Sequence, residues 1–226
     1  MFREILSAFA KETAVDRAFA ELDAMLREGA WMFERANDVL HSRVTPEKAE
    51  DAIYSRDRRI NDLERSIRRK ILRHLTVNPG YDVPVCLALL SVARDAERIG
   101  DYCKNVFEIG RFYSRGFHIA KYHEPLEQSY SEIKGIFQTL AEACRDPDRQ
   151  EEARESKRRM LEIQRRCDHL IEELFEDEGE IEFHEAVAYS LLARHYKRVA
   201  AHLTNIASAV LGELAELDFD PDNGPS

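Results

Sequence analysis

Two acidic residues one helical turn apart are the first candidates for chemistry in this sequence. Glu97 and Asp101 lie in the stretch AERIGDYCKNV, residues 96–106. On a helix their Cβ atoms are about 6 Å apart on one face, so both carboxylates can reach one cation. After a shift of one hundred residues this stretch aligns with YKRVAAHLTNI, which has Lys197 and Ala201 in place of the two acids. The pattern predicts metal binding in the first copy only.

Two further acids, Asp57 and Glu64, lie within about 60° of the apolar stripe of another predicted helix. Together with Glu97 and Asp101 they would form an oxygen-only site, which suits Mg²⁺, Mn²⁺, Ca²⁺ or iron. In the second copy, the Lys197 ammonium would repel a divalent ion about 6 Å away by about 5 kcal/mol at an effective dielectric of 20. We therefore predict at most one metal centre in the chain.

Other interpretations of these residues stay open at this point. The 43 acids among 226 residues produce about 8 acid pairs with this spacing by chance, so a solvated charged face is one alternative. His195 and His202, seven residues apart, are considered as ligands but fit polar helix positions better. Asp57 and Glu64 can also form surface ion pairs with the arginines of their own helix, which are Arg56, Arg58, Arg59, Arg65, Arg68 and Arg69.

A carboxylate-bridged di-metal enzyme of the ferritin-like helical type is the alternative from a different functional class. Such an enzyme needs Glu-x-x-His motifs on two helices, and none occurs in this sequence. The face that carries Glu97 and Asp101 also turns away from the apolar stripe of its helix, whereas metal catalysis needs a dry cavity. Both features count against this alternative.

The elements that must position these acids are long helices, because apolar residues recur every three or four positions between clusters of Gly and Pro. Pro46 follows Thr45, a pattern typical of a helix start. The first helix is expected over Phe2–Leu40 and the second from Pro46 to near His74. The other four are expected at Val85–Val106, Leu126–Cys144, Met160–Leu174 and Leu192–Val210.

The third and sixth apolar stripes coincide after the same shift, which indicates an internal duplication. We predict an all-α fold of two tandem antiparallel three-helix bundles. The first repeat is expected over residues 1–115, the second and degenerate repeat over 122–216, and a disordered acidic tail over 217–226.

The composition narrows the class of protein. The net charge of −10 disfavours binding to nucleic acid or to an anionic membrane surface. No signal peptide and no uncharged run of about 18 apolar residues is present, so we expect a cytoplasmic protein. The cysteines lie far apart among apolar residues and are expected to be buried free thiols, namely Cys86, Cys103, Cys144 and Cys167.

The stretch AERIGDYCKNVFE resembles the signature L-E-R-I-G-D-x-x-x-N-I-x-E of the PhoU phosphate-uptake regulators. The preceding DRRINDLERSI is similar to the D-x-x-I-x-x-L-E pattern of the family's second helix. NPGYDVP resembles the family's P-x-x-x-D-L-R turn, although one residue is missing and Val83-Pro84 replace its Leu-Arg. With the degenerate second copy, the resemblance covers nearly the whole chain.

The resemblance implies a non-enzymatic regulator that damps phosphate import or phosphate-starvation signalling. The implied partners are a phosphate transporter subunit, a sensor histidine kinase, or both, which would hold the chain at the inner membrane, and a homodimer is expected. The implied cofactor is a divalent or trivalent metal, with iron, Mn, Mg and Zn as candidates. Glu97 and Asp101 match its ligand motif, while Asp57 and Glu64 fall on acidic positions of the second-helix pattern.

Overall fold

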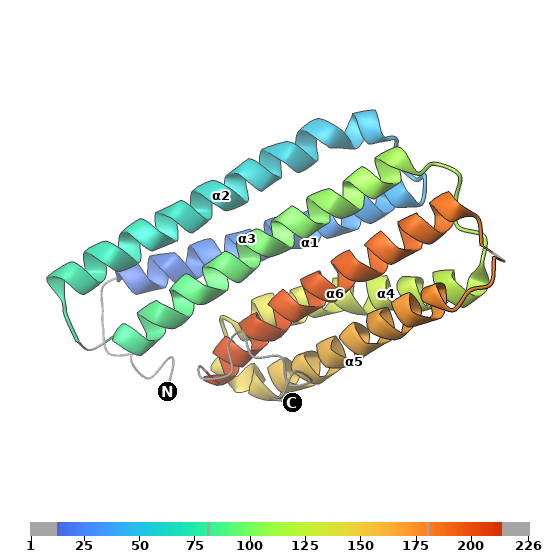
Figure 1. Cartoon of the computed structure of the whole chain (residues 1–226). Helices are drawn as coiled ribbons and strands as arrows, with labels where there is room; N and C mark the ends of the chain where they lie inside the picture. Colours follow the sequence, from blue (N-terminus) through green and yellow to red (C-terminus); the bar gives the residue numbers. More distant parts are fainter. Residues whose placement is uncertain (1–12, 81, 180, 214–226) are drawn as a thin grey trace.

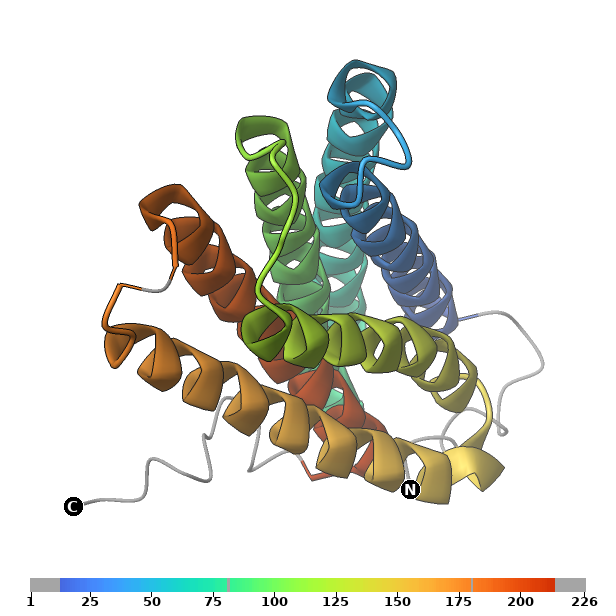
Figure 2. The ribbon, with the colours of Figure 1, turned by 90° about the vertical axis from the view of Figure 1, so that its right-hand side faces the viewer.

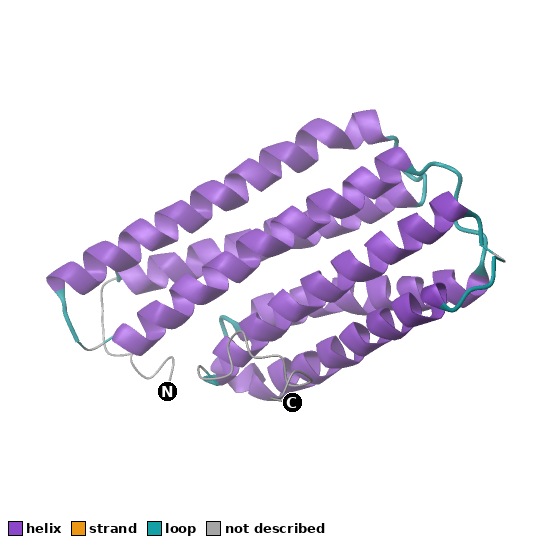
Figure 3. Ribbon diagram, viewed as in Figure 1, coloured by secondary structure: helices purple, strands orange, loops and turns teal. Residues whose placement is uncertain are grey.

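The computed structural model describes residues 13–80, 82–179 and 181–213. Within these residues the chain forms six long α-helices, a short 3-10 turn and no strand (Figure 3). The predicted all-helical fold of two three-helix bundles is confirmed. The helices are α1 (Ala14–Leu40), α2 (Pro46–Val77), α3 (Val83–Phe112), α4 (Ala120–Ala143), α5 (Gln150–Phe175) and α6 (Phe183–Leu211), and the turn η2 (Pro147–Arg149) precedes α5.

The start of α1 differs from the prediction that one helix runs from Phe2. Thr13 caps the helix: its Oγ1 accepts a hydrogen bond from the Asp16 backbone N–H at 3.1 Å, and the Asp16 carboxylate accepts one from the Thr13 N–H at 2.8 Å. This reciprocal capping box sets the first turn at Ala14. The stripe positions before it lie in residues 1–12, which are outside the described residues, as is the predicted tail 217–226.

The start of α4 is a second correction. We expected this helix to begin after Pro125, but it begins at Ala120 and contains the proline. A proline inside a helix removes one backbone hydrogen bond. Ser129 lies one turn later, and its hydroxyl donates a hydrogen bond to the Pro125 carbonyl at 2.7 Å. The other helices extend beyond the predicted ends, since periodicity locates the middle of a helix better than its termini.

The six helices lie in four layers (Figure 1). α2 is outermost on one side, α1 and α3 form the next layer, α4 and α6 the third, and α5 is outermost on the other side. Figure 2 shows the same order from a view turned by 90°, with α5 on the far side of α4 and α6 from the first three helices. The two repeats therefore meet through α1 against α4 and α3 against α6.

The contact between α1 and α4 is antiparallel, and three pairs of a basic and an acidic side chain lie along it or just beyond the helix ends. His41 lies 3.0 Å from Glu127, Lys134 lies 2.8 Å from Glu34, and Arg145 donates through Nε to Asp23 at 3.0 Å. From the first pair to the third, the α1 residue lies nearer the start of its helix and the α4 residue lies nearer the end of its own. Both helices therefore fix the relative position of the repeats.

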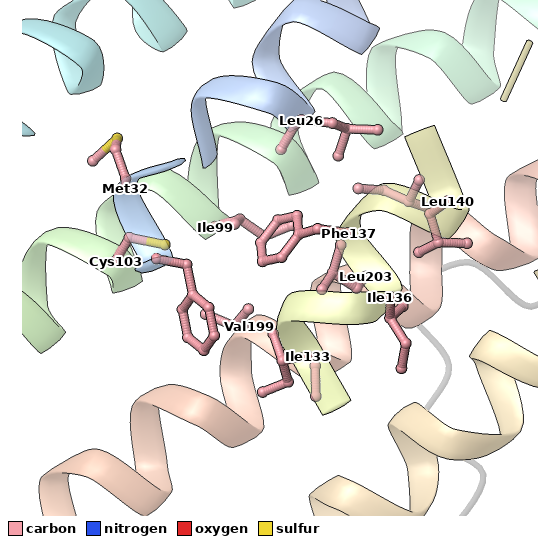
Figure 4. Packing of buried hydrophobic residues seen from close by; sticks show 14 of the residues in the cluster. Leu26, Met32, Ile99, Cys103, Ile133, Ile136, Phe137, Leu140, Val199 and Leu203 are labelled. Atoms are coloured by element: carbon pink, nitrogen blue, oxygen red, sulfur yellow. The ribbon is translucent and has the colours of Figure 1, made fainter. Parts of the chain in front are cut away.

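Apolar side chains of both repeats form one continuous core. Figure 4 shows its centre, where residues of α1, α3, α4 and α6 meet. The labelled side chains are Leu26, Met32, Ile99, Cys103, Ile133, Ile136, Phe137, Leu140, Val199 and Leu203. Burial of this shared surface supplies the main stabilising free energy of the joint. All four cysteines are free, and Cys144 is half-buried while the others are buried.

One glycine permits an especially close approach within the first repeat. A Cβ atom at Gly110 of α3 would lie 2.9 Å from the backbone nitrogen of Leu40 and 3.2 Å from Cγ1 of Val39. A distance of 2.9 Å to a backbone atom is shorter than van der Waals contact allows. The end of α3 therefore packs directly against the backbone of α1.

None of the helices in the described ranges combines the length and apolar content that a membrane crossing requires.

Candidate functional site

Close packing of α2 on α3 brings the four predicted acids onto facing sides of these helices. Gly100 leaves room for Ile60, because a Cβ atom at Gly100 would lie only 3.1 Å from Ile60 Cδ1. All four acids are partly buried, including Glu97 and Asp101, whose face was predicted to be open to solvent. The exposed fractions of their side chains are 14% for Asp57, 14% for Glu64, 19% for Glu97 and 31% for Asp101.

A lysine that sequence analysis missed connects the two helices at this point. Lys104 of α3 donates through Nζ to Asp57 of α2 at 3.3 Å and to Asp101 of its own helix at 3.1 Å. Burial alone would lower the pKa of this ammonium, but the bonds and charges of Asp101 and Asp57 raise it. Lys104 is therefore firmly cationic. Its i,i+3 spacing from Asp101 was the available sequence signal.

The alternative that Asp57 and Glu64 form ion pairs with arginines of their own helix is correct for only one of these two acids. Glu64 pairs with Arg68 at 2.6 Å, whereas Asp57 pairs with Lys104. On α3, Arg98 lies 3.3 Å from Asp101. Each of these ion pairs is at least partly exposed, so each adds little to the free energy of unfolding.

The pKa of Glu97 is affected by all three other acids of the group. Burial raises the pKa of its carboxyl, and the Asp101 carboxylate raises it further, whereas Arg98 lowers it. Glu64 and Asp57 add smaller contributions in the raising direction, which places their charges within electrostatic reach of Glu97. The acidic neighbours thus disfavour the ionised form of Glu97, and a bound cation would relieve this repulsion.

The donor set therefore fits a hard cation in its chemistry, but the side chains do not converge as they stand. Among the residues that the structure describes, no group of three or more His, Cys, Asp or Glu side chains is arranged to hold a metal ion. Lys104 and the two arginines already neutralise part of the acidic group. The four-carboxylate site stays a prediction.

The second repeat lacks this group entirely. If Ile163 and Leu170 of α5 are aligned with Ile60 and Ile67 of α2, Met160 and Cys167 occupy the positions of Asp57 and Glu64. Both replacements are buried in the core. On α6, Lys197 and Ala201 replace Glu97 and Asp101.

Lys197 forms an ion pair of its own, in which its Nζ donates to both oxygens of Asp168 on α5 at 2.7 Å. Both repeats thus connect their second and third helices through a lysine and an aspartate. The lysine and the aspartate stand at different positions in each repeat.

A polar cluster that sequence analysis did not find lies between α3 and α6, where the two repeats meet. Asp95 is buried, and its Oδ1 accepts hydrogen bonds from His202 Nδ1 at 2.8 Å and Asn205 Nδ2 at 3.0 Å. The Tyr102 ring stacks on His202 with centroids 5.7 Å apart and lies 5.8 Å from the His195 ring.

The members of this cluster are related by the internal duplication. Asp95 corresponds to His195, and Tyr102 corresponds to His202, after the shift of one hundred residues. Within the described residues Asp95 Oδ2 and His202 Nε2 have no hydrogen-bond partner. The two histidines that we considered as ligands thus serve the contact between repeats. The correspondence of positions 95 and 195 was visible in the sequence, but it did not show that Asp95 contacts His202 or that His195 lies beside Tyr102.

The fold and the acidic group define a class: a duplicated three-helix protein whose first repeat alone carries a group of four carboxylates between its second and third helices. Residues 22–110, which span most of α1 to α3, match the family model described as the PhoU domain. These residues are therefore similar to the PhoU domain, and the resemblance to the PhoU family is confirmed.

Two curated relatives extend this similarity. A protein of Xylella fastidiosa strain Temecula1 named phosphate-specific transport system accessory protein PhoU homolog is 28% identical over 218 residues, covering 87% of this chain and 82% of the relative. A protein of Caulobacter vibrioides with the same name is 28% identical over 116 residues, covering 51% of this chain and 50% of the relative.

Two crystal structures share the fold. PhoU from Pseudomonas aeruginosa superposes with a TM-score of 0.77 at 20% identity, covering 90% of this chain and 97% of that chain. The phosphate transport system regulatory protein PhoU from Streptococcus pneumoniae gives a TM-score of 0.68 at 19% identity, covering 90% and 98%. At these identities the superpositions establish the fold of both repeats.

Proposed function

We propose that this protein is a non-enzymatic regulator of phosphate transport that acts by docking on a phosphate transporter subunit, a sensor kinase, or both. The observation that carries the proposal is the similarity of residues 22–110 to the PhoU domain. The names of the relatives, which are accessory proteins of phosphate-specific transport systems, support the same role.

An exposed apolar face offers a surface for a protein partner. Phe183, Val187 and Leu191 recur every four residues on α6 and are exposed to solvent. Phe112 at the end of α3 is exposed at the same end of the molecule (Figure 1). Large apolar side chains grouped on one surface are typical of interaction sites. A transporter, a kinase or a second copy of the chain would bury them.

Metal binding by the first repeat is the second part of the proposal. Asp57 and Glu64 of α2 and Glu97 and Asp101 of α3 would supply carboxylate oxygens, which suit hard and borderline cations. The bound cation would neutralise the repulsion among these acids and tie α2 to α3. In this proposal the metal has a structural or sensing role and supports no catalysis.

The regulatory role is tested in cells that lack the chromosomal gene and express the wild-type chain or a variant. Wild type should lower ³²P-phosphate uptake and silence a phosphate-starvation reporter when phosphate is plentiful. Val187→Asp with Leu191→Asp should lose this effect and should also lose the transporter or kinase in a pull-down. Leu72→Asp, a change at an exposed residue of α2, is the control and should behave like wild type. Equal uptake with and without the wild-type chain would contradict the proposal.

The metal is tested separately. Glu97→Lys with Asp101→Ala gives α3 the residues of α6, and this double variant should bind no Mn²⁺ in equilibrium dialysis. Ser91→Ala, on the same helix before the acidic group, is the control. Equal Mn²⁺ content in wild type and the double variant would remove the four acids from the proposal without affecting the regulatory role.

A further inference from the structure

Four exposed arginines on α3 and α6 are repeated in the duplication although the core does not need them. After the shift of one hundred residues, these two helices have the same residue type at five positions. Two of the five are alanines that are buried in both repeats, and packing accounts for them. A third is an asparagine, of which Asn205 hydrogen-bonds with Asp95 in the joint. The remaining two are the arginine pairs Arg94 with Arg194 and Arg98 with Arg198, all exposed to solvent.

These arginines lie on one side of the joint between α3 and α6, a surface that we call the arginine face. Asp95 and its counterpart His195 mark the sides on which the two helices meet. On each helix the two arginines lie about 60° and about 100° around the axis from that contact, in the same direction. Because the helices are antiparallel and side by side (Figure 1), equivalent positions turn to the same side of the pair. Both repeats therefore contribute to one cationic surface.

The cations of this face differ in how far the chain itself neutralises them. Arg98 lies 3.3 Å from Asp101 and forms an ion pair with it. Arg198 donates through Nε to a neutral tyrosine hydroxyl of α3 at 3.1 Å, which leaves its charge in place. Among the described residues, the side chains of Arg94 and Arg194 have no hydrogen bond or ion pair. Three of the four guanidinium groups are thus available to an anionic partner.

An apolar segment adjoins the arginine face on α6. Val187 and Leu191 are exposed, and Arg194 and Arg198 follow them at the three- and four-residue spacing of one helical stripe. A segment lying along α6 would therefore meet apolar side chains first and then two cations. Guanidinium groups bind carboxylates through paired, charge-assisted hydrogen bonds. The net charge of −10 opposes dense polyanions such as DNA or an anionic membrane, whereas a short acidic protein segment carries much less charge.

We propose that the arginine face binds a carboxylate-rich segment of the protein partner, with Val187 and Leu191 contacting apolar residues beside it. The inference rests on the proposed docking role and names the partner chemistry that this role leaves open. Arg94 and Arg194 bind the carboxylates most directly, since neither has to leave a partner of its own. Only the joined repeats present all four arginines together.

The test measures the fluorescence anisotropy of a labelled peptide in which glutamates alternate with alanines and two leucines follow. The full chain should bind this peptide, and the same peptide with glutamines in place of glutamates should not bind measurably. Arg94→Gln with Arg194→Gln should weaken binding about tenfold, and added salt should weaken the wild-type complex. Arg58→Gln with Arg69→Gln is the matched control and should bind like wild type, because both arginines are exposed on α2 and the net charge changes equally.

Three results would overturn the proposal. The first is equal affinity of wild type and Arg94→Gln with Arg194→Gln for the glutamate peptide. The second is tighter binding of duplex DNA or of phosphatidylglycerol vesicles than of the peptide, which would identify a different class of partner. The third is binding of the peptide only by a chain that ends at Glu213, which would mean that the acids beyond this residue occupy the face.

The peptide assay and the phosphate-uptake assay separate this inference from the proposed function. If the variant without Arg94 and Arg194 binds the peptide like wild type while the wild-type chain lowers uptake, the arginine face is wrong and the regulatory role stands. If the peptide results are as expected but the wild-type chain does not change uptake, the arginine face stands and the regulatory role is wrong.

Discussion

The two repeats use the same helical framework but close the contact between their second and third helices differently. In the first repeat, partly buried Asp57 and Glu64 of α2 face α3 and are neutralised by basic side chains. In the second, Met160 and Cys167 at the matching positions of α5 are buried in the core. The framework therefore depends on the apolar positions that both repeats share. The positions of Asp57 and Glu64 can therefore be acidic in one repeat and apolar in the other.

The largest expected effect comes from placing an acid of the first repeat into the second. Met160→Asp would bury a carboxylate where Met160 is fully enclosed, and it should lower the free energy of unfolding by about 3–5 kcal/mol, measured by urea denaturation. Asp57→Met, the reverse exchange, removes a partly exposed carboxylate and should cost less than about 1 kcal/mol. Equal losses for the two variants would show that the α2 and α5 positions are equivalent after all.

Gly110→Val should have the next largest effect. Position 110 corresponds to Val210 in the second repeat, but a Cβ atom there would lie 2.9 Å from the Leu40 backbone. We expect a loss of about 2–3 kcal/mol in urea denaturation, because the backbone of α1 must move. Gly135→Ala, a helical glycine with no atom within 4 Å of its added Cβ, is the control and should raise stability by up to about 1 kcal/mol. A wild-type midpoint for Gly110→Val would refute the close approach.

A smaller effect on stability should come from His195 of α6 and should depend on pH. His195 corresponds to Asp95 of α3 in the duplication. Burial, with a smaller contribution from Arg194, lowers the pKa of His195 from 6.5 to about 4. Its stabilising contribution is therefore complete above pH 6.5 and is lost as the pH falls from 6.5 toward 4, since the unfolded chain takes up the proton first. Between pH 7.5 and pH 5, the Tm of wild type should fall by about 2–4 °C more than that of His195→Gln. Parallel pH profiles would contradict this.

Loss of the lysine–aspartate pair of the second repeat should have the smallest effect. The side chain of Asp168 is half exposed, so Asp168→Asn should cost no more than about 0.5 kcal/mol, and the cost should vanish in 1 M salt. Asp62→Asn, which removes an exposed pair with Arg65 in the first repeat, should give a similar value. A loss above about 2 kcal/mol would mean that Lys197 and Asp168 hold the second repeat together.

The properties that could be predicted from the sequence were those set by spacing along one helix. The helices, the apolar stripes and the duplication follow from periodicity, because every turn of a helix repeats the same geometry. The pairing of Glu97 with Asp101 on one face follows in the same way. The cap at Thr13 also has a local signature, Thr-x-x-Asp, but the apolar stripe continues through it and hides the helix start.

The remaining features depend on how helices are placed against one another. Lys104 reaches Asp57, and Asp95 reaches His202, only because packing fixes the position of one helix along its neighbour. That position is set by close contacts such as Gly100 on Ile60, which no periodicity encodes. The apolar stripes of α2 and α5 also fit each other at more than one shift, and the shift that pairs Ile60 with Ile163 places Met160 and Cys167 at the acidic positions.

The antiparallel contacts of α1 with α4 and of α3 with α6 have a further consequence. They make each half of the chain the permanent partner of the other, like a symmetric dimer whose subunits are joined by residues 113–119. A linker this short keeps the halves at an effective concentration that dilution cannot lower. Because α2 and α5 take no part in the joint, mutations there can accumulate in one half without separating it from the other. A dimer of two identical chains would receive every such change twice, whereas this chain can keep an acidic surface on one side only.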